Sequence, residues 1–581
     1  MVDPPQAGSL STFSLGPSAV APPGTGQTRS NVKTGLLLWV CAFVFYAGIG
    51  MWLTLHFNLV DGDGPSRVAD GGYVLFSRNP HLGAIGFIWN PLPSMAEIPF
   101  LLFKGLWPAL QAKGQAGTLQ SSLFMASAVW QIYRLTLDRK IPNPWRWVLI
   151  AGFALSPMIV LYGGNALSEA ALVFCTTWAA RRLMLWMEDR NSVHLAMAGI
   201  ALGVGYLARY EALFAGVFAI ALVVATSAYR EGILRRERRR AAVATAMHDG
   251  VLIGFPLTLT FLGWAVAGWL LTGQAFQQFT SQYGNSSQLK GSHVVVASGV
   301  GQIVTSLEDS MRAIVSIEPL LPTVLVVVAA ITIKRRSAAL LAPLAVFGGV
   351  LAFEIAAQAK GLTFGWFRFY ITTIPLCVCA LAIFWPRTIG PAEQAQPRRW
   401  RGLSRHTLWG LAALAVLLPS FPVTWSAMLN PAIGNQFDQT GLRYIFTSAS
   451  AKRYTYPQFD EYRSDRALAA WLDAQRLPRA SVLLDTFQGW EIWLSSKRPQ
   501  QFVITSDYDF LSALDDPARY GIRYILDSNP AVESVDAVNR RYPRLWSTGG
   551  GISMRVLTVN SRSGPPWRVF RVIGGSGDGL R

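Results

Sequence analysis

Long apolar runs, separated by short polar connections, fill most of the chain up to about residue 430. Each run is about 20 residues long, which is the length that a helix needs to cross a hydrocarbon core of about 30 Å. The expected spans are 35–56, 118–137, 147–163, 168–187, 193–207, 211–229, 250–272, 315–333, 338–358, 366–386 and 406–428. The pattern predicts a mainly α, polytopic membrane protein with about 11–13 transmembrane helices.

Composition and charge agree with a membrane protein. Hydrophobic residues make up 51% of the chain and charged residues 14%, with a mean hydropathy of +0.31, whereas soluble proteins carry about 25% charged residues. The net charge of +18 comes mainly from short basic connections between the spans, at 137–146, 229–240, 333–336 and 397–405. The positive-inside rule explains this charge better than nucleic-acid binding does, and it places these connections and the N-terminus in the cytoplasm.

One apolar segment, 83–107, does not fit this alternation. Its "NPLP" at 90–93 interrupts a regular helix, because proline removes a backbone donor and clashes with the preceding turn. We therefore expect a re-entrant or interfacial segment there instead of a crossing.

The two ends of the chain differ from the membrane domain, 34–430. Residues 1–33 are rich in Pro, Gly, Ser and Thr, which predicts a disordered cytoplasmic tail, and they lack the pattern of a signal peptide. Residues 431–581 carry many charges and short β-prone runs after a helical stretch. These runs, at 481–487, 500–506, 520–528 and 553–559, with the helical stretch at 464–475, predict a soluble extracytoplasmic α/β domain.

The cysteines do not indicate a metal site. All four lie inside apolar spans, and the pair Cys377 and Cys379 has neither a second pair nor a histidine beside it. We expect buried, inert thiols.

The same alternation of spans gathers the ionisable residues near the membrane at the outer face. The outer segments are expected at 57–82, 162–169, 208–211, 273–312, 359–368 and after about 430. Because charges within or beside membrane spans are costly unless they have a function, this face is the candidate site.

Asp63 has two interpretations that are compatible with each other. It precedes Pro65 and a partly amphipathic run, which favours a helix N-cap. It is also placed to act as a general base at the outer membrane face. Asp61, two residues earlier, either shares that site or is a solvated loop residue.

A second group of charges lies at the outer ends of later spans. Arg209 and Glu211 interrupt about thirty apolar residues, so they form either a structural ion pair or, through Arg209, a phosphate site. Glu169 begins a span, where an acidic residue suits the helix dipole. Glu354 lies inside a span near its outer end, where a carboxylate faces protein or water and not lipid.

Aromatic residues surround Arg368 in "GWFRFY" at 365–370. This cluster is either an interfacial aromatic belt or a platform for a sugar or phosphate. Trp366 belongs to it.

Several of these motifs together resemble the polytopic glycosyltransferases of the GT-C superfamily. The resemblance rests on an aspartate just after the first span, the "DGPSR" stretch, the "SRNPHLGAIGFIWNPLP" run, "ARYE" and a late outer-face arginine. It is best over 35–230. It implies a GT-C-like fold and an enzyme that takes a sugar from a polyprenyl-phosphate donor at the extracytoplasmic face, similar to protein mannosyltransferases or arabinosyltransferases.

The resemblance also implies roles for single residues. The first-loop aspartate of the superfamily falls on Asp63, with Asp61 as the alternative. Arg209 and Arg368, with Arg67, are the expected partners of the donor phosphate.

The remaining implied residues are secondary. His81, Trp89 and Trp366 are expected to line a sugar or lipid groove, although a histidine beside Pro80 more often makes a loop hydrogen bond. Asn79 stands where relatives often have an acidic residue, and monophosphate-linked donors in this superfamily need no metal. We therefore expect no metal and no cofactor.

The sequence thus favours an inverting hexosyl- or pentosyltransferase with an Asp base, which binds the lipid-linked donor, a glycan, lipid or protein acceptor and the bilayer, but no nucleic acid. A transporter or lipid flippase, and a non-catalytic scaffold with an outer binding domain, remain alternatives. The Ala-, Gly- and Arg-rich composition, without an endoplasmic-reticulum signal, suits a multi-pass protein of a bacterial plasma membrane that acts in cell-envelope glycan synthesis.

Overall fold

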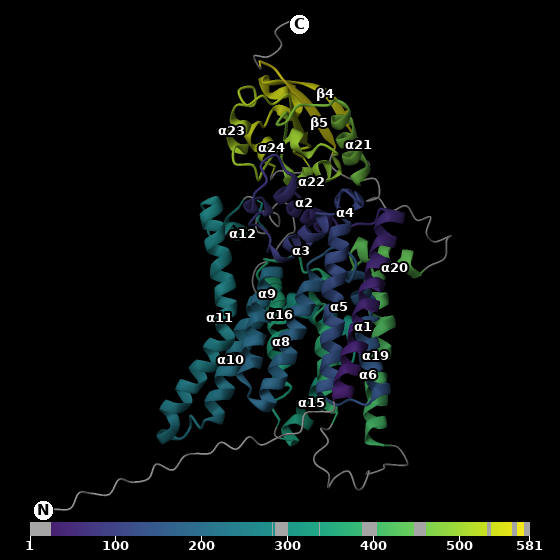
Figure 1. Cartoon of the computed structure of the whole chain (residues 1–581), viewed down its shortest axis with the longest axis vertical. Helices are drawn as coiled ribbons and strands as arrows, with labels where there is room; N and C mark the ends of the chain where they lie inside the picture. Colours follow the sequence, from purple (N-terminus) through teal and green to yellow (C-terminus); the bar gives the residue numbers. More distant parts are fainter. Residues whose placement is uncertain are drawn as a thin grey trace, which may run out of the picture.

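The computed structural model describes residues 25–281, 283–284, 300–335, 337–385, 404–446, 461–531, 536–560 and 566–574. Most of the expected tail, much of the outer loop 273–312 and most of the basic connection 397–405 therefore lie outside the described residues. Long helices form a bundle, and the C-terminal domain lies at one end of it (Figure 1).

Every expected span coincides with at least one helix of the bundle. The bundle helices are α1 (Thr25–Met51), continued by the π-helical turn η1 (Trp52–His56), α5 (Gln115–Asp138), α6 (Asn143–Ala154), α7 (Pro157–Tyr162), α8 (Glu169–Asp189), α9 (Ser192–Ala208), α10 (Glu211–Arg230), α11 (Arg239–Thr272), α14 (Val300–Ile317), α15 (Leu321–Lys334), α16 (Leu341–Ala359), α17 (Thr373–Phe384) and α19 (Arg405–Leu429). The prediction of a mainly α, helical membrane protein is confirmed.

Two of the expected spans are interrupted near a proline. The span at 147–163 is divided into α6 and α7 at Pro157, and the span at 315–333 contains an 84° bend between α14 and α15, where Pro322 begins the second helix. Proline fixes its φ angle and cannot donate to the preceding turn, so it starts a new helix more readily than it continues one.

Among the described residues, five helices are long and apolar enough to cross a membrane on their own, and the bent pair α14–α15 is a possible sixth. Their ranges are Ser30–His56, Glu211–Arg230, Arg236–Thr272, Leu341–Ala359 and Arg405–Leu429. The number of crossings stays a prediction.

Short helices lie between the bundle and the C-terminal domain (Figure 1). They are α2 (Asp63–Phe76), the 3-10 turn η2 (Leu82–Ile85), α3 (Leu92–Leu101) and α4 (Ala109–Ala112). With 10 residues, α3 is about 15 Å long, too short for a hydrocarbon core. This agrees with the expectation that 83–107 is not a crossing.

The C-terminal domain is an α/β domain, as predicted. Its five strands have the order β2-β1-β3-β5-β4. β1 pairs with β2 and β3 in parallel, and β5 pairs with β3 and β4 antiparallel. The elements are α21 (Glu461–Ala474), β1 (Val482–Leu484), α22 (Thr486–Ser495), the 3-10 turn η7 (Pro499–Gln501), β2 (Phe502–Ile504), α23 (Phe510–Asp515), β3 (Tyr524–Ser528), α24 (Ala537–Arg541), α25 (Leu545–Thr548), the 3-10 turn η8 (Gly549–Gly551), β4 (Ser553–Val559) and β5 (Trp567–Val572).

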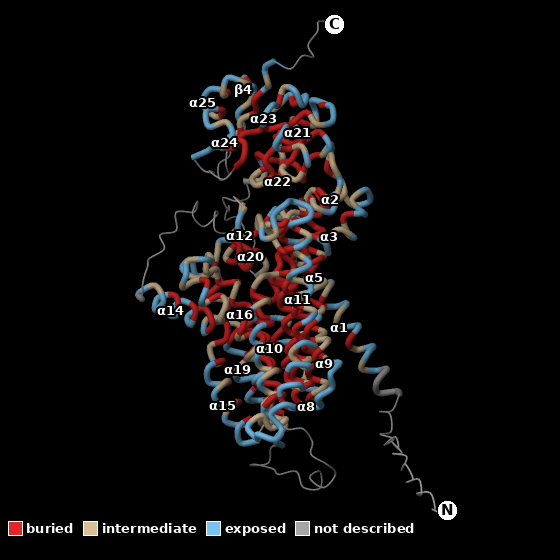
Figure 2. Tube along the Cα trace, turned by 90° about the vertical axis from the view of Figure 1, so that its left-hand side faces the viewer, coloured by how far each residue is buried: buried red, intermediate tan, exposed pale blue. Residues whose placement is uncertain are grey.

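The first helix after residue 430 belongs to the bundle. This helix, α20 (Gln436–Phe446), packs against α19 and α7. Buried segments run through the middle of the bundle and through the sheet (Figure 2).

Helix α2 packs against the C-terminal domain. Val68 and Tyr73 belong to one apolar core with α22 and the strands, and the ring of Tyr73 meets that of Trp493 edge-on at 4.6 Å. Just after α2, Arg78 forms ion pairs with Asp507, at 3.2 Å, and with Asp509. These contacts fix the position of the segment that carries Asp61 and Asp63.

Candidate active site at one end of the helix bundle

Arg368 brings three carboxylates together. It lies in the 3-10 turn η4 (Phe367–Tyr370), and its Nη1 donates to Asp61 and its Nη2 to Asp63, each at 2.8 Å. Its Nε lies 3.1 Å from Glu169 at the start of α8. Three segments that are far apart in the sequence, at residues 61–63, at Glu169 and in η4, thus meet at one buried guanidinium.

The N-cap interpretation of Asp63 is wrong. Helix α2 begins at Asp63 itself, its N-cap position is Gly62, and no side chain caps the helix. The Asp63 carboxylate accepts from Arg368 instead, because the fold brings this cation beside it and a guanidinium is a stronger donor than a backbone N–H. The side chain of Asp63 stays 37% exposed, against 14% for Asp61.

Arg209 forms the ion pair that the sequence suggested, and a second one. Its Nε donates to Glu211 at 2.8 Å and its Nη1 to Glu169 at 2.9 Å. Glu169 therefore bridges the two arginines, Arg209 and Arg368. All three nitrogens of Arg209 bind acceptors on the protein.

Glu354 extends this network into the bundle. Its charge interacts with those of Glu211 and Arg209, and it is buried in α16, as expected for a carboxylate that faces protein. One helical turn later, Gln358 accepts from the Tyr370 hydroxyl at 2.8 Å.

Aromatic rings lie against Arg368 and Arg67. The guanidinium of Arg368 lies 4.1 Å from the ring centre of Trp366, and that of Arg67 lies 4.2 Å from Trp89. The Nε and Nη1 atoms of Arg67 are buried without a hydrogen-bond partner among the described residues. Of the three expected phosphate partners, Arg67 is therefore the one with donors to spare.

His81 lies away from this network. Its ring stacks on Tyr508 of the C-terminal domain at 4.2 Å, and its Nδ1 lies 2.7 Å from the Asn79 carbonyl oxygen. The interpretation as a loop hydrogen-bonding residue holds in the structure.

Burial perturbs the ionisation of Asp61. Removal from water raises its pKa from 3.8 to about 6; Arg368 acts in the opposite direction, and the carboxylates of Asp63 and Glu169 add to the rise. A carboxylate with such a pKa holds a proton more readily near neutral pH than an ordinary aspartate does.

Two further acidic groups were missed by the sequence analysis. Asp438 of α20 is fully buried, accepts from the Tyr162 hydroxyl at 2.7 Å, and has a pKa raised by burial to about 7. Its charge also interacts with Arg368 and Asp61. The signal available in the sequence was its position shortly after the outer end of the last expected span.

The other missed group is Glu97 in α3. It is fully buried, and neither carboxyl oxygen has a hydrogen-bond partner among the described residues. Burial raises its pKa well above the usual value, and it interacts with Arg67 and Asp70. An acidic residue inside the apolar segment 83–107 was the signal for it.

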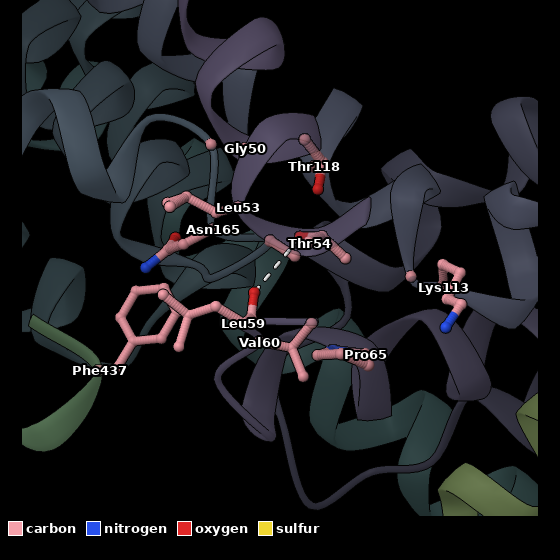
Figure 3. Close-up of a pocket in the computed structure, with 13 residues that line it drawn as sticks. Gly50, Leu53, Thr54, Leu59, Val60, Pro65, Lys113, Thr118, Asn165 and Phe437 are labelled. Carbon is pink, nitrogen blue, oxygen red and sulfur yellow. Dashed lines mark hydrogen bonds between the residues drawn. The ribbon is translucent and has the colours of Figure 1, made fainter. Parts of the chain in front are cut away.

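A small pocket adjoins the Asp61–Asp63 segment (Figure 3). Val60 and Pro65, on either side of the two aspartates, line it together with Lys113, Asn165 and Phe437. The Nδ2 of Asn165 is buried without a partner among the described residues.

Within the described residues, no group of three or more His, Cys, Asp and Glu is arranged to hold a metal ion. A guanidinium, that of Arg368, lies among the three carboxylates. The expectation of a metal-independent enzyme stays a prediction.

The chain matches no protein-family model and no curated protein. Among solved structures it is similar to the oligosaccharyltransferase AglB from the archaeon Archaeoglobus fulgidus. One AglB structure, in complex with an inhibitory peptide and a dolichol-phosphate, is 12% identical with a TM-score of 0.37, and the match covers 84% of this chain and 69% of that one. A second, in complex with Zn and sulfate, is 13% identical with a TM-score of 0.39, covering 84% and 68%.

A third AglB structure, tethered with an acceptor peptide, is 12% identical with a TM-score of 0.36, covering 90% of this chain and 74% of that one. At this level of similarity, the activity and ligands of AglB are not transferred to this chain.

Proposed function

We propose that this chain is a membrane glycosyltransferase that moves a sugar from a polyprenyl-phosphate donor to an acceptor at the extracytoplasmic face, with inversion at the anomeric carbon. The observation that carries the proposal is the convergence of Asp61, Asp63 and Glu169 on Arg368 at the end of an apolar helix bundle. Such a cluster is costly beside a membrane, and it offers both a base and a fixed positive charge.

The proposed reaction breaks the bond between the anomeric carbon and the phosphate oxygen and forms a bond from that carbon to the acceptor oxygen. Asp63 takes the proton of the acceptor hydroxyl, because its carboxylate is the more exposed of the two aspartates. The electron pair of the broken bond leaves with the lipid phosphate.

Arg67 is the proposed partner of the departing phosphate. Its Nε and Nη1 lack partners among the described residues, and a planar guanidinium matches two phosphate oxygens. Arg209 and Arg368, whose nitrogens already face carboxylates, position the acidic groups and contribute positive charge to the site.

The C-terminal domain is the proposed contributor to acceptor recognition. It is packed against α2, which begins at Asp63, and Tyr283 of the segment after α11 donates to Asp485 at 2.6 Å. An acceptor bound between this domain and the bundle would lie near the proposed base.

The test is transfer of labelled sugar from a polyprenyl-phosphate donor by membranes that contain the full chain. Asp63→Asn keeps the shape of the side chain but removes its basicity, so we expect the rate to fall by about 10²–10⁴. Asp516→Asn, a change at an exposed aspartate of the C-terminal domain, is the matched control and should leave the rate unchanged.

Asp61→Asn separates the two aspartates. A wild-type rate for Asp63→Asn with a large loss for Asp61→Asn would assign the base to Asp61. Wild-type rates for both single variants and for the double variant would contradict the proposed role of the two aspartates. Absence of transfer by the wild-type chain would favour the transporter or scaffold alternatives.

A further inference from the structure

A second pocket, at the opposite end of α2 from Asp63, is lined by cations. It lies where the end of α2 and the turn after α3 meet two loops of the C-terminal domain. Its lining residues are Leu75, Phe76, Lys104, Leu477, Arg479, Lys497, Arg498, Pro499, Gln500 and Gln501. Four of the ten are basic, and no acidic residue is among them.

These four cations are not neutralised by the described part of the chain. None of them forms an ion pair with a described carboxylate. The Nζ of Lys104 donates to Gln111 at 2.7 Å and lies over the Phe76 ring, and Arg479 donates to the Arg78 carbonyl oxygen.

An acidic side chain that contacts the pocket loop, that of Asp473, is already engaged. Asp473 accepts from the Ser496 hydroxyl at 2.6 Å, from the Lys497 backbone N–H at 2.8 Å and from the Gln501 amide at 2.9 Å. It fixes the loop that carries Lys497 and Arg498 and leaves their side chains exposed. Four positive charges around one pocket repel each other unless an anion lies between them.

The turn beside this pocket has the character of a membrane-surface segment. Around Lys104, the side chains of Leu102, Phe103 and Leu106 are 64%, 59% and 86% exposed. This turn follows α3, between the bundle and the C-terminal domain (Figure 1). Apolar side chains at such a level enter the acyl boundary of a bilayer, while a lysine among them extends to the headgroups.

From the unneutralised cations and the apolar turn together, we infer that this pocket binds the phosphate of an anionic membrane lipid. The apolar turn lies against the acyl chains, and Lys104, Arg479, Lys497 and Arg498 surround the headgroup phosphate. The lipid thereby connects the C-terminal domain to the membrane surface.

The test uses the purified full chain in a neutral detergent and the short-chain lipid dihexanoyl phosphatidylglycerol, with binding followed by calorimetry. The variant Lys497→Gln/Arg498→Gln removes two exposed charges, so we expect binding at least about tenfold weaker, since each cation near a lipid headgroup contributes a severalfold gain. The variant Arg519→Gln/Arg555→Gln makes the same charge change at exposed positions outside the pocket and should bind as the wild type does.

Two probes identify the source of the phosphate. Dihexanoyl phosphatidylcholine and glycerol phosphate should each bind at least about tenfold more weakly than phosphatidylglycerol, because the first lacks net charge and the second lacks acyl chains. Lys104→Gln is a second pocket variant, and because it removes one cation we expect a severalfold loss of affinity.

The inference is wrong if the pocket variants bind phosphatidylglycerol as tightly as the wild type, or if the control variant loses as much affinity as they do. It is also overturned if glycerol phosphate binds as tightly as the lipid. Sugar transfer is not part of this readout, so the outcome is independent of the proposed enzymatic function.

Discussion

At the scale of single residues, the candidate site depends on which partner each charge finds. From the sequence, Asp63 had the spacing of a helix cap, and in the structure it pairs with Arg368, which lies 305 residues away. Arg209 and Glu211 are close in sequence, so their pairing was predictable, whereas the bridge through Glu169 requires the tertiary fold. Asp438 and Glu97 were missed for the same reason, since burial and neighbours define them.

Arg368 should be essential to the stability of the fold as well as to the site. Arg368→Ala leaves three carboxylates without their common cation, and removal of one partner of a buried pair costs about 3–5 kcal/mol. The control is Arg312→Ala, because Arg312 is 68% exposed and its nearest carboxylate, Asp309, lies at 3.9 Å. An exposed ion pair contributes about 0–1 kcal/mol to stability. Thermal unfolding in detergent measures the difference in stability between the two variants. Equal effects of the two variants would contradict the role of Arg368.

The ionisation of Asp61 should give an acidic limb to the dependence of the transfer rate on pH. Its folded pKa of about 6 lies above 3.8, so below pH 6 it is neutral and releases its ion pair with Arg368. We expect transfer to fall as the pH drops through about 6, and this limb should disappear in Asp61→Asn.

The raised pKa of Asp61 affects the stability of the fold in the direction opposite to its effect on the transfer rate. Because the folded pKa is raised, Asp61 favours folding below pH 3.8, and this contribution is lost as the pH rises through about 6. Asp61→Asn should therefore flatten the dependence of thermal stability on pH over this range. An unchanged pH profile of both rate and stability in Asp61→Asn would contradict the assignment.

At the scale of elements, apolar runs predicted the helices well and their breaks less well. A run of about 20 apolar residues reads as one span, but Pro157 and Pro322 each start a new helix inside such a run. Strand β5 (Trp567–Val572) was not predicted, because its two arginines, Arg568 and Arg571, interrupt the apolar pattern of the segment. Its pairing with β3 and β4 exists only in the folded sheet.

The contact of α2 with α22 offers a test at this scale. A Cβ added at Gly72 would lie 2.8 Å from the ring of Trp493, whereas one added at Gly48 in α1 would meet nothing within 4 Å. Gly72→Ala should destabilise the protein by about 1–3 kcal/mol, since overpacking displaces a rigid ring. Gly48→Ala should stabilise it by about 0.5–1 kcal/mol, because alanine favours a helix interior.

Thermal unfolding of the full chain in detergent would measure both effects. If Gly72→Ala is as stable as Gly48→Ala, α2 is not held tightly against the domain.

At the scale of the whole molecule, the arrangement of charge along the chain was the most informative property of the sequence. The alternation of basic connections predicted that Asp61, Glu169, Arg209, Glu354 and Arg368 share one face, and the structure brings them into one network. Which membrane contains the protein, and the number of its crossings, stay predictions, since neither follows from helix length and packing. The sugar and the acceptor depend on side-chain details that no periodicity encodes.

The central claim is that this network transfers a sugar from a lipid phosphate. The most direct measurement is transfer of labelled sugar from polyprenyl phosphate by the purified full chain in proteoliposomes, with the Asp61→Asn/Asp63→Asn double variant alongside. We expect labelled product from the wild type, in the presence or absence of a chelator, and a rate lower by at least about 10² from the double variant. Equal transfer by the two proteins would contradict it.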